Sequence, residues 1–173
     1  LARYASTARM VFGPRTAYRT PTGRVHEDGQ PGPLRPLLGC SLLNFDGMRD
    51  GLVVHVGQHE VRHWAENYRL TTGVASHRYT DGPLAGTAAV VQNGTVTTIG
   101  AWSASLIDEI LRRALVEAGV PVISLPEGVR IARRGDFEVW LNFNPHPVIL
   151  PDGSEIGPVS FDIRGRSRAS HGK

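Results

Sequence analysis

The chain has 173 residues, of which 40% are hydrophobic and 20% charged, a composition typical of one globular domain or of one domain with a small appendage. It has no run of about 18 apolar residues and no apolar leader, so we expect neither a membrane span nor a signal peptide in this sequence. The net charge of +3 comes from scattered arginines, and only Arg164, Arg166 and Arg168 cluster, so nucleic acid is not an expected partner.

The first third of the chain alternates short regular segments with a long loop. Residues 1–8 are typical of the last turns of a helix, and residues 9–12 of a short buried strand that ends at Gly13-Pro14. Prolines and glycines recur through residues 16–36, which predicts a long ordered loop without continuous helix or strand. Apolar residues return at 37–45, and residues 52–56 form a β-branched run that predicts a strand.

The middle of the chain predicts short strands joined by glycine-containing turns. The expected strands cover residues 68–71, 74–79 and 88–91. Asn93-Gly94 is the strongest hairpin signal, because a type I′ turn requires positive φ at both central residues. We therefore expect residues 88–92 to pair with residues 95–99.

Residues 104–118 predict the clearest helix. Leu106, Ile110 and Leu111 lie on its apolar face, whereas Asp108 and Glu109 lie on the opposite face and are expected to point outward. Ser103 is placed to act as the N-cap, and Gly119 to end the helix in a left-handed conformation. The wide apolar face predicts that this helix packs on a sheet.

Beyond Pro126 the hydrophobic pattern changes to a period of two. It predicts four short strands, at residues 129–133, 137–143, 148–150 and 159–163, as a small antiparallel β domain. So few residues rarely bury enough apolar surface to be stable alone. The expected domains are residues 1–125 and 126–165, followed by a disordered tail at 166–173.

Cys40 is the only cysteine, which excludes an internal disulfide and favours the reducing cytoplasm. A cysteine on an α/β scaffold suggests a nucleophile, but the sharp turn that exposes one needs a small residue two positions later, where Leu42 stands. A buried structural thiol is therefore the favoured interpretation, and a thiol enzyme the alternative.

Three histidines, His55, His59 and His63, recur every four residues, the spacing of a zinc site on one helix face. However, residues 52–56 predict a strand rather than a helix, so we do not expect the three rings to converge. No glycine-rich phosphate loop joins a strand to a helix, and we expect no cofactor. We assign no catalytic, metal-binding or cofactor-binding residue.

Aromatic residues offer another candidate site, because a sugar ring stacks well on an exposed aromatic side chain. Residues of this type more often pack in cores and interfaces, which we take as the favoured interpretation. The candidates for such a sugar platform are Trp64, Tyr68, Trp102, Trp140 and Phe143.

Three stretches of the sequence resemble the β-galactosidases of glycoside hydrolase family forty-two. They are Val11-Phe12-Gly13-Pro14-Arg15, Gly32-Pro33-Leu34-Arg35-Pro36-Leu37-Leu38-Gly39 and Tyr79-Thr80-Asp81-Gly82-Pro83-Leu84-Ala85-Gly86. The resemblance covers the non-catalytic region of that family and weakens toward Arg164. It implies an α/β fold, a partial three-layer domain that is flavodoxin-like or glutamine-amidotransferase-like, followed by the small antiparallel β domain.

The same resemblance implies a function. The chain would be the trimerisation and C-terminal region of a β-galactosidase that hydrolyses terminal non-reducing β-D-galactosides with retention, as a homotrimer and without a cofactor. The two catalytic glutamates of that family lie on a (β/α)₈ barrel, the acid/base after an asparagine, and no Asn-Glu pair occurs here. The start at Leu1 fits a fragment, expected to be inactive alone and to partner its own upstream barrel, which binds the galactoside. The alternative is a free-standing carbohydrate-binding or assembly module.

Overall fold

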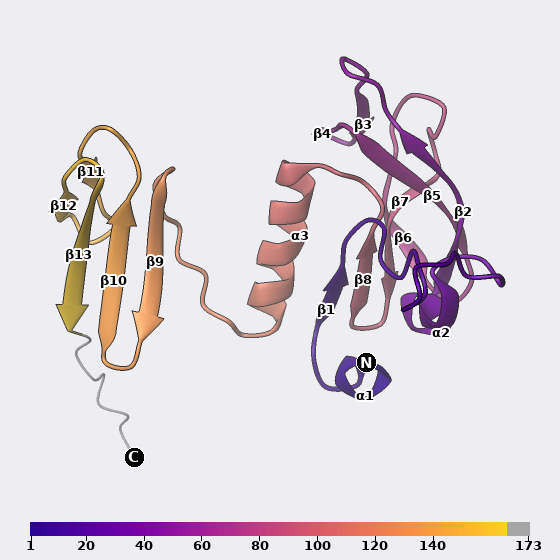
Figure 1. Ribbon diagram of the computed structural model, residues 1–173, viewed down its shortest axis with the longest axis horizontal. Helices are drawn as coiled ribbons and strands as arrows, with labels where there is room; N and C mark the ends of the chain where they lie inside the picture. Colours follow the sequence, from indigo (N-terminus) through magenta and orange to yellow (C-terminus); the bar gives the residue numbers. More distant parts are fainter. Residues whose placement is uncertain (166–173) are drawn as a thin grey trace. The chain divides into compact units, whose positions relative to one another are not determined.

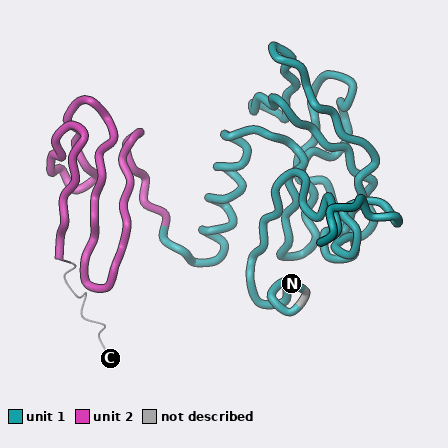
Figure 2. The backbone as a smooth tube through the Cα atoms, in the orientation of Figure 1, with its two compact units in different colours: residues 1–121 teal, residues 122–173 magenta. Residues whose placement is uncertain are grey.

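The chain divides into two compact units, Leu1–Pro121 and Val122–Lys173, which Figure 2 colours separately. The computed structural model describes residues 1–165, so the disordered tail predicted for residues 166–173 lies outside the described residues. Within this described part of the chain, no helix is long and apolar enough to cross a membrane.

Unit 1 is built around a four-stranded sheet with the strand order β1-β8-β7-β6 (Figure 1). Its strands are β1 (Met10–Phe12), β6 (Val74–Arg78), β7 (Ala88–Asn93) and β8 (Val96–Ile99). β1 runs parallel to β8, whereas the other pairs are antiparallel. The predicted α/β class is thus confirmed as a mixed sheet with helices.

The hairpin predicted at Asn93-Gly94 exists, but its turn is shifted by one residue. Asn93 pairs with Val96, so Gly94 and Thr95 form the loop. Of the hairpin's residues, only Gly94 has a positive φ, of 58°, which fits a type II′ turn and not the predicted type I′. Asn93 stays extended because its side-chain amide donates to the carbonyl oxygens of Pro36 and Leu37, at 3.2 and 3.0 Å.

Apolar side chains pack on both faces of the sheet, because successive residues of a strand point to opposite sides. Val90 belongs to a core cluster with Leu106 and Ile110 of the long helix. Val91, its neighbour in β7, belongs to a second cluster with Leu38 and Cys40. Both central strands are largely buried, which fits their small and β-branched residues.

The predicted helix is α3 (Ala104–Glu117), which Figure 1 shows after β8. Ser103 occupies the N-cap position, but its hydroxyl makes no capping bond and lies 3.4 Å from the hydroxyl of Ser105. Gly119 follows the helix with a φ of 68°, the left-handed conformation predicted for its end.

The remaining elements of unit 1 lie in its first 70 residues. They are α1 (Ala2–Ala5), the 3₁₀ helix η1 (Gly32–Leu34), α2 (Arg35–Leu38), β2 (Cys40–Gly47), β3 (Val54–Val56), β4 (His59–Val61) and β5 (Trp64–Leu70). β2 pairs with β5 and β3 with β4, both antiparallel. The sequence predicts β3 but misses β4. The chain turns between these two strands at Gly57, which has a φ of 59°.

Unit 2 is the antiparallel β region predicted for the end of the chain. Its strands are β9 (Val129–Arg134), β10 (Phe137–Asn142), β11 (Val148–Ile149), β12 (Glu155–Ile156) and β13 (Ser160–Gly165). They form a three-stranded sheet of order β13-β10-β9 and a short β11-β12 pair. Val129, Trp140, Leu150 and Ile156 make its small core.

Candidate interaction surfaces

Cys40 lies fully buried in β2, packed with Leu38 and Tyr68. Burial, helped by the nearby Glu66 carboxylate, raises the pKa of its thiol to about 12. A cysteine acts as a nucleophile through its thiolate, which is scarce at neutral pH with such a pKa. The geometry therefore favours a structural thiol over a thiol enzyme.

The three regularly spaced histidines have separate surroundings. His55 Nδ1 lies 2.6 Å from Asp81 Oδ2, and His59 lies against α3. His63 is exposed, with a φ of 70°. Among residues 1–165 no group of three histidine, cysteine or carboxylate side chains has the geometry to hold a metal ion.

Glu109 faces the strands, so the expectation that it points outward is wrong. Its carboxylate lies 2.9 Å from His59 Nε2 and 3.4 Å from His77 Nε2, which links α3 to β4 and β6. The other ring nitrogen of His59 lies 3.0 Å from the Ser105 hydroxyl. Burial opposes ionisation, but the hydrogen bonds from the two histidines hold the pKa of Glu109 below its usual value. Asp108 points outward as predicted and pairs with Arg112.

The five aromatic candidates are divided between the two units, and two of them, Tyr68 and Trp140, are buried. Tyr68 is buried and Trp102 is exposed in unit 1, whereas Trp140 and Phe143 belong to unit 2. Trp140 is buried, and the Arg164 guanidinium lies 5.4 Å from the centre of its ring. Trp64 instead stacks on Phe45, at a ring separation of 4.6 Å.

Glu66 is the most buried carboxylate described, with only 4% of its surface exposed. Its Oε1 accepts the Arg15 backbone N–H at 2.8 Å and the Trp64 indole N–H at 2.9 Å, and its Oε2 accepts the Tyr68 hydroxyl. Burial, helped by this carboxylate, raises the pKa of Tyr68 well above its ordinary value. Sequence patterns missed this network, because Arg15 lies 51 residues before Glu66 in the chain.

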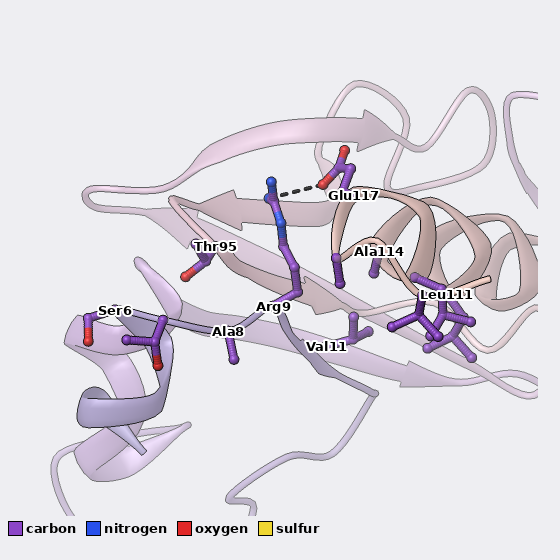
Figure 3. A pocket seen from close by; sticks show the side chains of 12 residues that line it. Ser6, Ala8, Arg9, Val11, Thr95, Leu111, Ala114 and Glu117 are labelled. Atoms are coloured by element: carbon purple, nitrogen blue, oxygen red, sulfur yellow. Dashed lines mark ion pairs between the residues drawn. The ribbon is translucent and has the colours of Figure 1, made fainter. Parts of the chain in front are cut away.

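A cleft of about 860 Å³ lies between α3 and the segment that leads into β1 (Figure 3). Val11, Leu111, Ala114 and Leu115 supply apolar lining to this α3–β1 cleft. Leu111 and Leu115 remain 43% and 39% exposed, so the apolar stripe of α3 is only partly covered. β1 is also the edge strand of the sheet, with β8 as its only pairing partner within the described residues.

Unit 2 also presents an apolar sheet face. Val139 and Leu141 of β10 lie opposite Ile163 and Phe161 of β13, and side chains opposite each other share a face. Phe137 lies on that face by its spacing along β10. Phe161, Ile163 and Phe137 are each more than half exposed, which is unusual for a surface that stays in water.

Comparisons with known proteins relate this fold to one family. A family model described as the β-galactosidase trimerisation domain matches residues 1–121. The β-galactosidase BgaH of Haloferax lucentense is 32% identical over 167 residues, which covers 88% of this chain and 25% of that protein. A β-galactosidase of Thermus thermophilus is 29% identical over 154 residues, covering 82% of this chain and 22% of that protein. The chain therefore spans about a quarter of the length of these relatives.

A comparison with solved structures also finds a β-galactosidase. The polyextremophilic β-galactosidase of the Antarctic haloarchaeon Halorubrum lacusprofundi matches with a TM-score of 0.81 at 28% identity. The match covers 95% of this chain and 28% of that chain, so it extends beyond residue 121 into unit 2. The chain belongs to the β-galactosidase trimerisation domain family, to which its residues 1–121 correspond.

Proposed function

We propose that the chain is the subunit-assembly and C-terminal part of a β-galactosidase. The parent protein would hydrolyse terminal non-reducing β-D-galactosides with retention, as a homotrimer. Its catalytic (β/α)₈ barrel would lie outside this chain, bind the galactoside and pack with it. The observation that carries the proposal is the match of residues 1–121 to the trimerisation domain, in a chain one quarter as long as relatives named β-galactosidases.

The surroundings of the carboxylates support a catalytic site elsewhere. A retaining glycosidase uses two carboxyl groups about 5 to 5.5 Å apart on either side of the scissile bond. Here Glu66 is occupied by three donors from its own unit, and Glu109 by two histidines. Asp81 accepts hydrogen bonds from the ring and the backbone of His55. The three carboxylates are thus held by hydrogen bonds within unit 1, as in a structural role.

We further propose that the complete domain is a three-layer, flavodoxin-like or glutamine-amidotransferase-like fold. The sheet would continue beyond β1, and another segment of the parent would cover the open half of α3. Two features support this: a parallel edge strand is rarely left bare, and the α3–β1 cleft exposes leucines that a packed layer would bury. A cytoplasmic location without a cofactor also remains part of the proposal.

The test begins with the reading frame upstream of Leu1. The proposal expects several hundred further codons that include an Asn-Glu pair, and the product should cleave a chromogenic β-galactoside. The purified 173-residue chain should show no turnover. Turnover by this chain alone would contradict the proposal, and a start codon immediately before Leu1 would favour a free-standing binding or assembly module.

A further inference from the structure

Four side chains form one contiguous surface, the aromatic–arginine patch: Arg15, Tyr18, Phe45 and Trp64. The rings of Phe45 and Trp64 stack with an interplanar angle of 15°, and Tyr18 meets both edge-on at 5.5 and 6.2 Å. The Arg15 guanidinium lies over Trp64 at 5.0 Å and over Tyr18 at 5.5 Å. Phe45 is 41% exposed, so the patch faces outward.

The buried Glu66 carboxylate holds this patch in place. One carboxylate oxygen accepts the backbone N–H of Arg15 and the indole N–H of Trp64, which fixes two of the four members relative to each other. Burying a carboxylate costs free energy unless it is fully hydrogen-bonded. The three bonds to Glu66 offset that cost and preorganise an exposed surface.

The backbone of the same loop is strained. Arg15 has a φ of 65° and Ala17 a φ of 49°, both in the left-handed region that non-glycine residues rarely adopt. Such conformations persist where surrounding contacts enforce them, and they concentrate at functional surfaces. Here the enforced loop turns the guanidinium of Arg15 over the rings.

The charge of Arg15 is unmatched within the described chain. Among residues 1–165 no carboxylate lies within 4.0 Å of its guanidinium; the nearby Glu66 accepts only its backbone N–H. A guanidinium held against aromatic rings is well placed to bind a carboxylate through two parallel hydrogen bonds. Beside it, Tyr18, Val25, Leu43 and Phe45 line a depression of about 340 Å³ that can receive an apolar side chain.

We infer that the aromatic–arginine patch is a docking site for a second copy of the parent protein, with Arg15 binding an Asp or Glu side chain of that copy. This rests on the proposed trimeric function, which supplies the partner. Tryptophan, tyrosine and arginine are the residues that dominate binding energy in interfaces. In a cyclic trimer each copy offers this surface to a different surface of its neighbour, so no self-complementarity is needed.

The other open surfaces fit this role less well. The α3–β1 cleft adjoins the edge of the sheet, where the proposed fold adds a segment of the same subunit. The apolar face of unit 2 lies beyond residue 121, outside the residues that match the trimerisation domain. The patch is carried by the matching region and has both an apolar and a charged component.

The experiment compares full-length parent proteins by analytical ultracentrifugation. Arg15→Gln removes the charge and keeps most of the side-chain stem, and Arg15→Glu reverses the charge. We expect the trimer dissociation constant to rise at least about tenfold for Arg15→Gln and further for Arg15→Glu. Arg69→Gln is the matched control, because Arg69 is exposed on β5 and makes no ion pair within residues 1–165. Its dissociation constant should stay within about twofold of the unaltered protein.

A photo-cross-linking residue at position 43 gives a second readout that does not depend on Arg15. Cross-links between subunits support the inference, and cross-links confined to one subunit overturn it. If the unaltered parent is a trimer and both Arg15 variants form trimers of the same stability, the inference is wrong but the proposed function is unaffected. An unaltered parent that is monomeric contradicts the proposed function, and the inference with it.

Discussion

At the scale of single residues, Glu66 shows how one buried charge organises distant parts of unit 1. Its side chain joins the loop after β1 to two residues of its own strand, and the Tyr79 hydroxyl bonds the Glu66 backbone at 3.2 and 3.1 Å. Removing a buried carboxylate that accepts several hydrogen bonds destabilises the fold, because each buried donor left unpaired costs about 1–3 kcal/mol of folding free energy. The network therefore keeps the loop that carries Arg15 in one conformation.

Cys40 should be unreactive in the folded protein. With a pKa of about 12 and a fully buried sulfur, its thiolate is unavailable at pH 8. Thiol titration with a disulfide reagent should give equal counts for the native parent and its Cys40→Ala variant. In denaturant the unaltered protein should show one more thiol per chain. A difference already present in the native state would contradict the structural role.

Glu109 should make a pH-dependent contribution to stability. Its pKa in the folded protein is lowered from 4.5, so the stabilisation is present above that value and is lost as the pH falls through the folded pKa. The effect should stay below about 1 kcal/mol, because the carboxylate is 43% exposed and solvent screens it.

The measurement compares melting temperatures of the parent and its Glu109→Gln variant across pH. We expect the variant to melt lower at pH 6 to 7 and the two curves to converge as the pH falls below 4.5. Asp108→Asn is the control, because among residues 1–165 the exposed Arg112 is the only ion-pair partner of Asp108. A constant difference down to the lowest pH would show that the ionised Glu109 carboxylate is not its source.

At the scale of helices and strands, the sequence correctly predicts the features that depend on residues close together in the chain. The periodicity of α3 and the left-handed Gly119 depend on residues near each other, so the helix is predicted within one residue. The β7–β8 hairpin is predicted for the same reason, but its turn type is not, because Asn93 bonds to carbonyls 56 and 57 residues away. β4 is missed because Gly57 interrupts the apolar pattern before it.

The candidate surfaces depend on contacts that local pattern does not contain. The sequence predicts that α3 has an apolar face, but only the structure shows that Leu106 and Ile110 are buried while Leu111 and Leu115 remain exposed. Likewise, Trp64 was a candidate for sugar stacking, whereas its partners Phe45 and Arg15 come from other segments. Contacts between residues far apart in the sequence determine both the exposure of the α3 leucines and the surroundings of Trp64.

The open face of α3 leads to a prediction about Leu111. If another layer of the parent covers the α3–β1 cleft, Leu111→Ala should destabilise the full-length protein by at least about 2 kcal/mol, the cost of truncating a buried leucine. Val116→Ala is the control on the same helix, since Val116 is 67% exposed and does not line the cleft. It should change stability by no more than about 0.5 kcal/mol.

Denaturant unfolding of both variants measures the difference. Equal and small effects would show that the leucine stays in water and that no further layer of the parent covers the α3–β1 cleft. A large effect for Leu111→Ala alone would support the three-layer fold proposed above.

At the scale of the whole molecule, the exposed apolar surfaces mark places where the parent protein would pack. They are the α3–β1 cleft, the apolar half of the aromatic–arginine patch and the sheet face of unit 2. Among the described residues of unit 2, the core has four buried apolar side chains, too few to support an independent domain of this size.

The chain expressed alone should therefore aggregate or fold poorly, and it should be rescued when it is produced together with the upstream barrel proposed for its parent. The open edge of β1 offers unpaired backbone groups, and the apolar face of unit 2 offers Phe137, Phe161 and Ile163 for association. Size-exclusion chromatography with light scattering, followed by thermal melting, tests this for both preparations. A monodisperse monomer that melts cooperatively would contradict it, because it would show that these surfaces are stable in water without the rest of the protein.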